Sequence, residues 1–345
     1  MKQPSIKDIS QHSGVSTATV DRVLHGRSGV SRLSREKVAK SIHALQFRSL
    51  PDGLLVRGRP KIRFKFILPN VYTTFSGQIL KGVVDAPSAV EDMTIINDVQ
   101  HIDLDMPQAI VDALDGVDAS IYAGAALFAV DAPGVRAAID RLVERGVKVV
   151  SIVTDIADSK RHHFVGIDNA AAGRLGATLM GRFTAGKVGK IGVILGSTRM
   201  RDQYERLLSF SEVIATRFPS LRILPIVEGY SKAELNYSLT RKLVSRHYDL
   251  VGIYAVPAGQ SGILNALKDE GVGDRLTVIL HELSDRVAFE LKQGTVDACI
   301  AQSPGHVARS AVRVLKACCL GTPINASQEF IRTDIYLADN IPILS

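Results

Sequence analysis

The most constraining feature of this 345-residue chain is a pair of short helical patterns separated by Gly14. Ser5 and Asp8 have the spacing of a helix N-cap followed by an acid in the first turn. Gly14 ends this pattern, because glycine tolerates the left-handed conformation that a sharp turn between helices needs. Ser16 is the predicted N-cap of a second helix. Its apolar positions fall on one face: Val20, Val23 and Leu24. The sequence therefore predicts a helix-turn-helix, whose second helix can enter a DNA major groove.

The charges of the chain are unevenly distributed. Residues 1–65 contain 14 lysines and arginines against 4 acids, whereas the remaining residues contain 28 basic and 31 acidic side chains. A basic segment neutralises phosphates and releases counterions, which gives sequence-independent affinity for DNA. A merely solvated basic terminus lacks an ordered apolar pattern, and here the charges lie on one. We therefore expect double-stranded DNA to be a partner of the N-terminal segment.

Several classes of protein are disfavoured by composition. No run approaches 18 uninterrupted apolar residues, so we expect no membrane span. The N-terminus has no apolar secretory stretch, which favours a cytoplasmic, nucleoid-associated protein. The cysteines, Cys299, Cys318 and Cys319, lack metal-ligand spacing, and the adjacent His162 and His163 lack partners. We expect neither a metal nor a cofactor.

The pattern changes twice along the chain. A third helix is predicted from Ser34 as N-cap to Gln46, with an apolar stripe at Val38, Ile42 and Leu45. Prolines and glycines then punctuate residues 49–60, as in a linker. We predict a helix-turn-helix domain at residues 1–48, a hinge linker at 49–61 and a larger domain at 62–345.

The larger domain alternates strand and helix patterns. Predicted strands are Phe64–Leu68, Thr94–Ile96, Val147–Val153, Lys190–Leu195, Ile223–Val227, Leu250–Tyr254, Thr277–Leu280 and Ala298–Ala301. Predicted helices include Ala132–Arg145, Ala170–Phe183, Gln203–Arg217, Lys232–Ser245, Gly259–Glu270 and His306–Cys319. This number of strands favours two doubly wound parallel sheets, with a ligand cleft at the carboxyl ends of their strands.

Specific motifs carry a resemblance to a known family. In the first 48 residues they are Ile6-Lys7-Asp8-Ile9, Gly14-Val15-Ser16, Ala18-Thr19-Val20, Arg22-Val23-Leu24 and Arg35-Glu36-Lys37-Val38. In the larger domain they are Val165-Gly166-Ile167-Asp168-Asn169, Ala172-Gly173-Arg174 and Ile300-Ala301-Gln302. The chain resembles the LacI family of bacterial transcription regulators over nearly its whole length. The resemblance implies an α/β chain with a small all-α helix-turn-helix domain followed by a two-lobed, periplasmic-binding-protein-like effector domain.

Two segments depart from the family pattern. Asp21 stands where most members have serine, which we interpret as a variant operator preference. The linker lacks the usual hinge-helix motif, and its glycines weaken any isolated helix by roughly 1 kcal/mol each. The residue that wedges into the minor groove is therefore open between Leu54, Leu55 and Val56.

The resemblance also assigns DNA contacts. Thr17 and Ala18 would face base edges, and Arg22 would reach either a guanine or a phosphate. The predicted phosphate contacts are Ser16, Thr19, Arg27 and Ser31. Thr19 has an alternative as a helix residue that touches nothing. One small domain offers little surface, so we expect a homodimer on a pseudo-palindromic operator, and the lack of a heptad tail favours a dimer over a tetramer.

An effector site is predicted in the loops that follow strands. Its candidate residues are Phe75, Asp155, Asp168, Arg174, Glu282 and Gln302. Fixed polar groups beside an aromatic face suit a sugar, a sugar acid or a polyol. Three alternatives are open: Asp168 caps the next helix, Arg174 pairs with Asp168, and Gln302 completes a hinge strand. Ala255 replaces a common asparagine, which suggests either an altered ligand or a contact from Gln260.

Three functions are compatible with these features. The favoured one is an effector-controlled transcription regulator, by resemblance a repressor. The others are a solute-binding-protein-like sensor and a ligand-processing enzyme with an appended DNA-binding domain. We expect no enzyme, because the sequence has no nucleophile elbow, P-loop, zinc spacing or dinucleotide fingerprint. The sequence does not distinguish an inducer from a co-repressor.

Overall fold

The computed structural model describes residues 5–24, 29–45, 61–70, 73–86, 89–90, 93–184, 186–256 and 259–342. The chain forms two compact units, residues 1–62 with 88–95 and residues 63–87 with 96–345. We call the helical residues 5–45 the head and the described residues from 61 onward the body. Arg27, Leu54 and Leu55 lie outside the described residues, as does most of the predicted linker. In the part of the chain that the structure describes, no helix is both long and apolar enough to cross a membrane.

The head contains α1 (Ile6–Ser13), α2 (Thr17–Leu24) and α3 (Arg32–Ala44). Ser5 and Asp8 form a capping box: the Ser5 N–H donates to Asp8 Oδ2 at 2.6 Å, and the Asp8 N–H donates to Ser5 Oγ at 3.4 Å. Gly14 has a φ of 66°, so the turn uses the left-handed conformation. Ser16 caps α2 by accepting the Thr19 N–H at 3.3 Å. These contacts confirm the predicted helix-turn-helix.

A small apolar core joins the three head helices. Its buried members are Ile9, Val20, Val23, Leu24, Val38 and Ile42. The predicted start of the third helix is wrong by three residues. Ser34 is not the cap, because Ser31 Oγ accepts the Ser34 N–H at 3.2 Å and the helix begins at Arg32.

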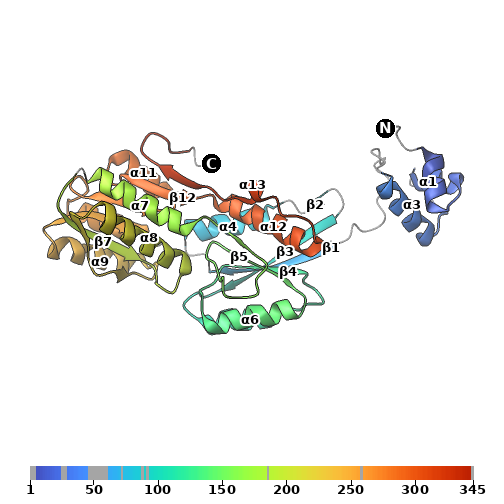
Figure 1. Cartoon of the computed structure of the whole chain (residues 1–345), viewed down its shortest axis with the longest axis horizontal. Helices are drawn as coiled ribbons and strands as arrows, with labels where there is room; N and C mark the ends of the chain where they lie inside the picture. The colour runs from blue at the N-terminus through green and yellow to red at the C-terminus, as the bar shows by residue number, and fades with distance from the viewer. Residues whose placement is uncertain are drawn as a thin grey trace. The chain divides into compact units, whose positions relative to one another are not determined.

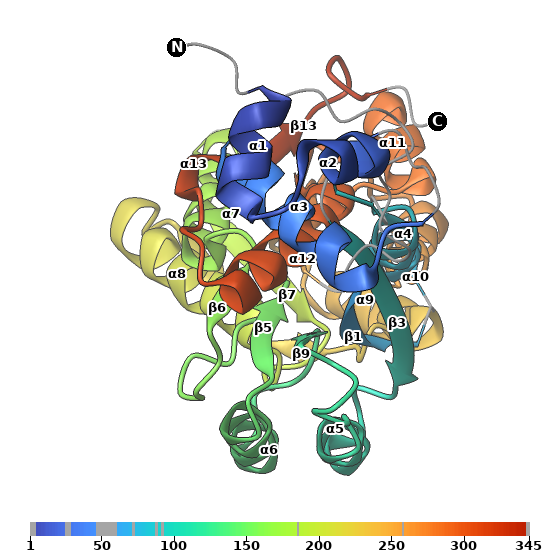
Figure 2. The ribbon, with the colours of Figure 1, turned by 90° about the vertical axis from the view of Figure 1, so that its right-hand side faces the viewer.

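The first half of the body, lobe 1, is built on a sheet with strand order β2-β3-β1-β4-β5-β6. The strands are β1 (Lys61–Pro69), β2 (Ala89–Val90), β3 (Met93–Ile102), β4 (Gly124–Leu127), β5 (Lys148–Ile152) and β6 (His163–Val165). The β1–β4, β4–β5 and β5–β6 pairs are parallel, and β2–β3 is antiparallel. Its helices are α4 (Thr74–Val84), α5 (Pro107–Asp115), α6 (Pro133–Glu144) and α12 (Pro304–Leu320). Helices α4 and α12 pack together on one face, and α5 and α6 lie side by side on the other (Figures 1 and 2).

Lobe 2 has a second sheet, with strand order β13-β12-β11-β10-β7-β8 and with β9 on β7. The strands are β7 (Gly189–Leu195), β8 (Leu221–Ile223), β9 (Val227–Glu228), β10 (Leu250–Ala255), β11 (Thr277–His281), β12 (Ala298–Gln302) and β13 (Thr333–Tyr336). Only the β12–β13 pair among them is antiparallel within the described strands. The helices are α7 (Asn169–Phe183), α8 (Arg201–Arg217), α9 (Ala233–Arg246), α10 (Gln260–Asp269) and α11 (Asp285–Gln293). Helices α9, α10 and α11 share one apolar core with the sheet.

The chain crosses between the lobes at three places. It leaves lobe 1 after β6, because α7 packs on β10, β11 and β12. It returns after β12, because α12 packs on β4 and β5, and it crosses again between α13 (Ala326–Glu329) and β13. These features confirm the predicted two-lobed α/β fold with mainly parallel sheets.

One predicted strand is wrong. Of the predicted run Ile223–Val227, Ile223 is the last residue of β8 and Val227 is the first residue of β9, so the residues between them belong to neither strand. Pro225 lies between them, and proline cannot donate to a strand ladder.

Candidate functional site

A large cavity lies between the lobes, where the carboxyl ends of strands from both sheets face each other. Its volume is about 960 Å³. Lobe 1 contributes residues that follow β1, β3, β4 and β5, and lobe 2 contributes residues that follow β7, β10 and β11. Ligands of open parallel sheets bind at this edge of the strands. The cavity is therefore the candidate effector site.

Arg206, Asp202 and Glu282 line one part of this cavity, which we call the floor. Arg206 belongs to α8. The residue is 2 % exposed. Its Nε donates to Asn169 Oδ1 at 3.0 Å, and its Nη1 lies 3.2 Å from His281 Nδ1. Since a guanidinium only donates, His281 Nδ1 accepts and the ring proton resides on Nε2, 2.7 Å from the Tyr254 hydroxyl. Burial, reinforced by the Arg206 charge, lowers the pKa of His281 well below its ordinary value, which fits this neutral ring.

Two carboxyl groups flank the remaining nitrogen of Arg206. Its Nη2 lies 3.9 Å from both Asp202 Oδ2 and Glu282 Oε1. Burial raises the pKa of both carboxyl groups above their ordinary values, while the Arg206 charge acts in the opposite direction. The floor therefore combines one permanent positive charge with two acids that protonate more readily than usual.

Two buried polar atoms of this floor, the donor Arg206 Nη2 and the acceptor Asp202 Oδ1, have no hydrogen-bond partner within the described residues. Unpaired buried polar groups cost about 1–3 kcal/mol each, so a native structure needs a reason to keep them. A hydroxyl both donates and accepts, so a polyhydroxylated molecule matches this mixture of groups.

Backbone strain is concentrated at the same cavity. The described non-glycine residues with positive φ are Val153 (66°), Tyr230 (48°), Ser231 (55°) and Glu282 (66°). All of them line the cavity. A β-branched residue such as Val153 is a genuine outlier in this region. Such strain is common at ligand sites, where the surrounding structure fixes it.

Three of the predicted effector residues lie at cavities. Phe75, in the first turn of α4, and Glu282, directly after β11, line the large cavity. Both also line a neighbouring cavity of about 400 Å³, together with Gln302. Gln302 ends β12, and its Nε2 donates to Glu282 Oε1 at 3.1 Å. Gln260 lines the large cavity too, but its amide donates to the carbonyl oxygens of His281 and Glu282.

The other three predicted effector residues line neither of these cavities. Asp168 caps α7 by accepting the Ala171 N–H at 2.8 Å, and Arg174 lies 3.8 Å from it, with both side chains more than half exposed. These are the structural alternatives that the sequence left open. Asp155 is bound by Arg161 through two hydrogen bonds of 2.5 Å and by Ser151 at 2.7 Å. Asp155, Asp168 and Arg174 therefore all interact with neighbouring groups of the protein.

Sequence reasoning missed Asp202, Gln203 and Arg206. Gln203 Oε1 accepts the Gly196 N–H at 2.6 Å, which fixes the loop after β7 at the cavity. A signal was present in the sequence. These polar residues share the buried face of α8 with Phe210, at a spacing where an amphipathic helix carries apolar side chains.

The head presents a second candidate surface, on α2. Ser16, Thr17, Ala18 and Arg22 are exposed, while the opposite side of the helix packs into the head core. Arg22 lies one turn after Ala18 on the same face. The Ser16 and Thr19 hydroxyls are 2.9 Å apart, so Thr19 has a partner within the helix end. Ser31 is exposed at the start of α3.

Family comparisons cover both parts of the chain. Residues 5–49 match the family described as bacterial regulatory proteins, lacI family. Residues 64–323 match the periplasmic binding protein domain family. Because the second match spans most of the chain, it establishes the family to which the body belongs.

Similar curated proteins carry names of regulators. A transcriptional regulator RegA of Clostridium saccharobutylicum is 31 % identical over 128 residues, 36 % of this chain and 37 % of the relative. The repressor CytR of Escherichia coli K12 is 27 % identical over 97 residues, 28 % of each chain. The matched segments thus span well under half the length of these relatives.

Solved structures resemble the body. A glucose-galactose binding protein of Geobacillus stearothermophilus aligns with a TM-score of 0.73 at 18 % identity, over 82 % of this chain and 99 % of that one. A solute-binding protein of Burkholderia graminis in complex with D-arabinose aligns with a TM-score of 0.74 at 19 % identity, over 84 % and 99 %. At these identities the likeness shows the fold alone.

Proposed function

We propose that this chain, whose body belongs to the periplasmic binding protein domain family and whose residues 5–49 match the lacI family of bacterial regulatory proteins, is an effector-controlled transcriptional repressor. The observation that carries this proposal is the presence, in one chain, of a helix-turn-helix whose second helix exposes a face with Arg22 and of a polar cavity between two lobes. The regulators among its relatives support the same function. It acts in the cytoplasm at the nucleoid and performs no catalysis.

We assign the DNA contacts to the exposed face of α2 and the adjoining helix ends. Thr17 and Ala18 face base edges, and Arg22 donates to guanine. Ser16, Thr19 and Ser31 contact phosphates, since helix N-termini favour anions. Arg27, Leu54 and Leu55 keep their predicted DNA roles without structural support. A homodimer places two heads on the half-sites of a pseudo-palindrome.

We assign the effector site to the large cavity. As the sequence predicted, Phe75 supplies an apolar face and Glu282 a hydrogen-bonding group, while Gln302 lines the neighbouring cavity and donates to Glu282. Asp202 and Arg206 are added because they lie in the cavity floor with unpaired polar atoms. The effector is a sugar, a sugar acid or a polyol. The sugar-binding proteins with the same fold support this class.

Two measurements on the full chain test the function. Melting temperatures are recorded with pentoses, hexoses, polyols and sugar acids, and double-stranded DNA ligands are selected from a random pool. We expect at least one compound to raise the melting temperature, a selected DNA with two-fold symmetry, and footprints that change with that compound. Turnover of the compound would contradict the proposal. A DNA footprint that is the same with and without the compound would contradict it too.

A further inference from the structure

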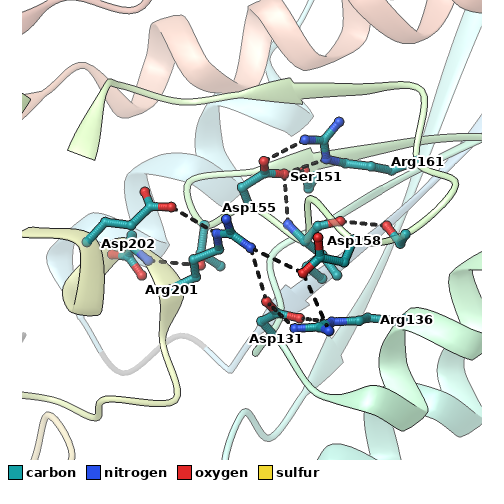
Figure 3. A network of polar contacts seen from close by, with 12 residues as sticks. Asp131, Arg136, Ser151, Asp155, Asp158, Arg161, Arg201 and Asp202 are labelled. Carbon is teal, nitrogen blue, oxygen red and sulfur yellow. Dashed lines mark hydrogen bonds and ion pairs between the residues drawn. The ribbon is translucent and has the colours of Figure 1, made fainter. Parts of the chain in front are cut away.

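Arg201, the first residue of α8, forms ion pairs that cross from lobe 2 to lobe 1. Its Nη1 lies 3.5 Å from Asp131 Oδ2 and 3.9 Å from Asp158 Oδ2 (Figure 3). Asp131 follows β4, and Asp158 lies in the loop between β5 and β6. Within α8, Arg201 Nε also donates to Glu205 at 2.8 Å.

Lobe 1 holds its side of this contact in place without Arg201. Arg136 binds Asp131 in a bidentate manner at 2.6 and 2.9 Å, and its Nη1 lies 3.5 Å from Asp158. The Asp131 side chain is 10 % exposed. Because Asp131 is already ordered by Arg136, pairing it with Arg201 orders mainly one further side chain, and partial burial protects the pair from solvent.

A second contact between the lobes lies next to the first. The Asp202 N–H lies 3.4 Å from Thr154 Oγ1, which directly follows the strained Val153 at the end of β5. The first turn of α8 carries Asp202, Gln203 and Arg206 to the cavity. The same turn is therefore held against lobe 1 by two consecutive residues.

We propose that Arg201, Asp131 and Asp158 form a latch that holds the two lobes in their present orientation and positions the first turn of α8 at the cavity. An effector shifts an equilibrium between lobe orientations only through its different affinity for them, and the latch sets the starting point of that equilibrium. Arg201 acts as a positioning residue, since it does not pair with the groups of the cavity floor.

Hydrogen exchange of the full chain, free of DNA and effector, tests the latch. The informative segments are 128–132 and 154–160 in lobe 1 and 197–203 in lobe 2. In Arg201→Gln we expect faster exchange in all of them, because each loses a partner across the lobe boundary. Glu205→Gln is the matched control: it removes the partner of the same guanidinium within α8, and we expect lobe 1 to be unchanged.

Charge and salt complete the experiment. Arg201→Lys is expected to restore part of the protection, since the charge remains. About 1 M salt, with a screening length of about 3 Å, should speed exchange of these segments in the native chain and add little in Arg201→Gln. Unchanged exchange in lobe 1 of Arg201→Gln, or an equal rise throughout the body, would overturn the latch. Neither result depends on the identity of operator or effector.

Discussion

At the scale of single residues, the cavity floor combines one fixed charge with two adjustable ones. A guanidinium stays protonated at any pH a protein tolerates, so Arg206 is positive in every state. The acids beside it have raised pKa values, because burial outweighs the attraction of Arg206. Ionised Asp202 therefore destabilises the effector-free protein, and protonated Asp202 does not.

Because of this free-energy cost, we expect Asp202→Asn to stabilise the chain instead of destabilising it. A carboxyl whose folded-state pKa lies above its ordinary value of 3.8 destabilises the fold at neutral pH, and the penalty fades as pH falls through the raised pKa. We expect Asp202→Asn to raise the melting temperature of the effector-free chain at pH 7, with a gain that shrinks towards pH 4. Thermal unfolding across this pH range measures it.

Glu329→Gln is the opposite case and serves as the control. Hydrogen bonds from Arg313 and Ser310 outweigh burial and lower the pKa of Glu329. Its stabilising contribution is present above the ordinary pKa and is lost as pH falls through the lowered one. Glu329→Gln should lower the melting temperature at pH 7 and less so in acid. The same sign for both variants would contradict our account of the floor.

The exposed Arg22 is tested by DNA binding. We expect Arg22→Ala to weaken binding to the selected operator by about 1–3 kcal/mol, the range of a good bidentate base contact, and to affect random DNA much less. Arg32→Ala changes an exposed arginine of α3 in the same head and serves as the control. Equal losses on operator and random DNA in Arg22→Ala would make it a phosphate contact.

At the scale of elements, α7 and α8 approach closely at Gly173. A Cβ built there would lie 2.2 Å from the Arg206 carbonyl oxygen and 2.2 Å from Ser209 Oγ. We expect Gly173→Ala to destabilise the chain by about 1–3 kcal/mol, the usual cost of overpacking, and to weaken the effector response by displacing Arg206. Denaturant unfolding and the effector-induced melting shift measure the two effects.

Gly134→Ala provides the comparison in α6. Its Cβ would meet only Val111 Cγ2, at an ordinary 3.5 Å. Replacing a helical glycine by alanine gains up to about 1 kcal/mol where space allows. Similar unfolding of the two alanine variants would show that α7 and α8 separate without cost.

Elements with strong local signals were predictable from the sequence. The capping box at Ser5, the left-handed Gly14 and the periodic stripe of Pro133–Glu144 are local features, and the structure contains all of them. The strand Gly124–Leu127 escaped prediction, because glycine and alanine have low strand propensity and its burial comes from the helices on both faces.

The site was predictable where a residue directly follows a strand. Glu282 directly follows β11, and Gln302 ends β12 one residue beyond the predicted strand, so both lie where the carboxyl ends of parallel strands meet. Arg206 was not predictable, since its position depends on contacts with Asn169 and His281, 37 and 75 residues away in the chain. Such long-range partners leave no local pattern.

At the scale of the whole molecule, the charge distribution separates DNA binding from effector binding. The net positive charge is concentrated in residues 1–65, which carry 14 basic and 4 acidic side chains, and the rest of the chain is nearly balanced. If a dimer neutralises about 6–10 phosphates, its affinity for random DNA should fall by about 10³–10⁵ between about 50 and about 200 mM salt. Effector affinity should change far less, because hydrogen bonds to hydroxyl groups release no counterions. Parallel titrations over this range test both, and equal salt dependence would contradict the separation.

The late position of α12 in the chain has a consequence for synthesis on the ribosome. This helix, Pro304–Leu320, covers a face of the lobe 1 sheet by packing on β4 and β5, although those strands are made much earlier. The described core of the head is complete by Ile42. Chains fold from their N-terminal end as they emerge, so the head gains its core while lobe 1 still awaits its last helix. A nascent chain that stops before residue 304 therefore has a complete head but an incomplete lobe 1.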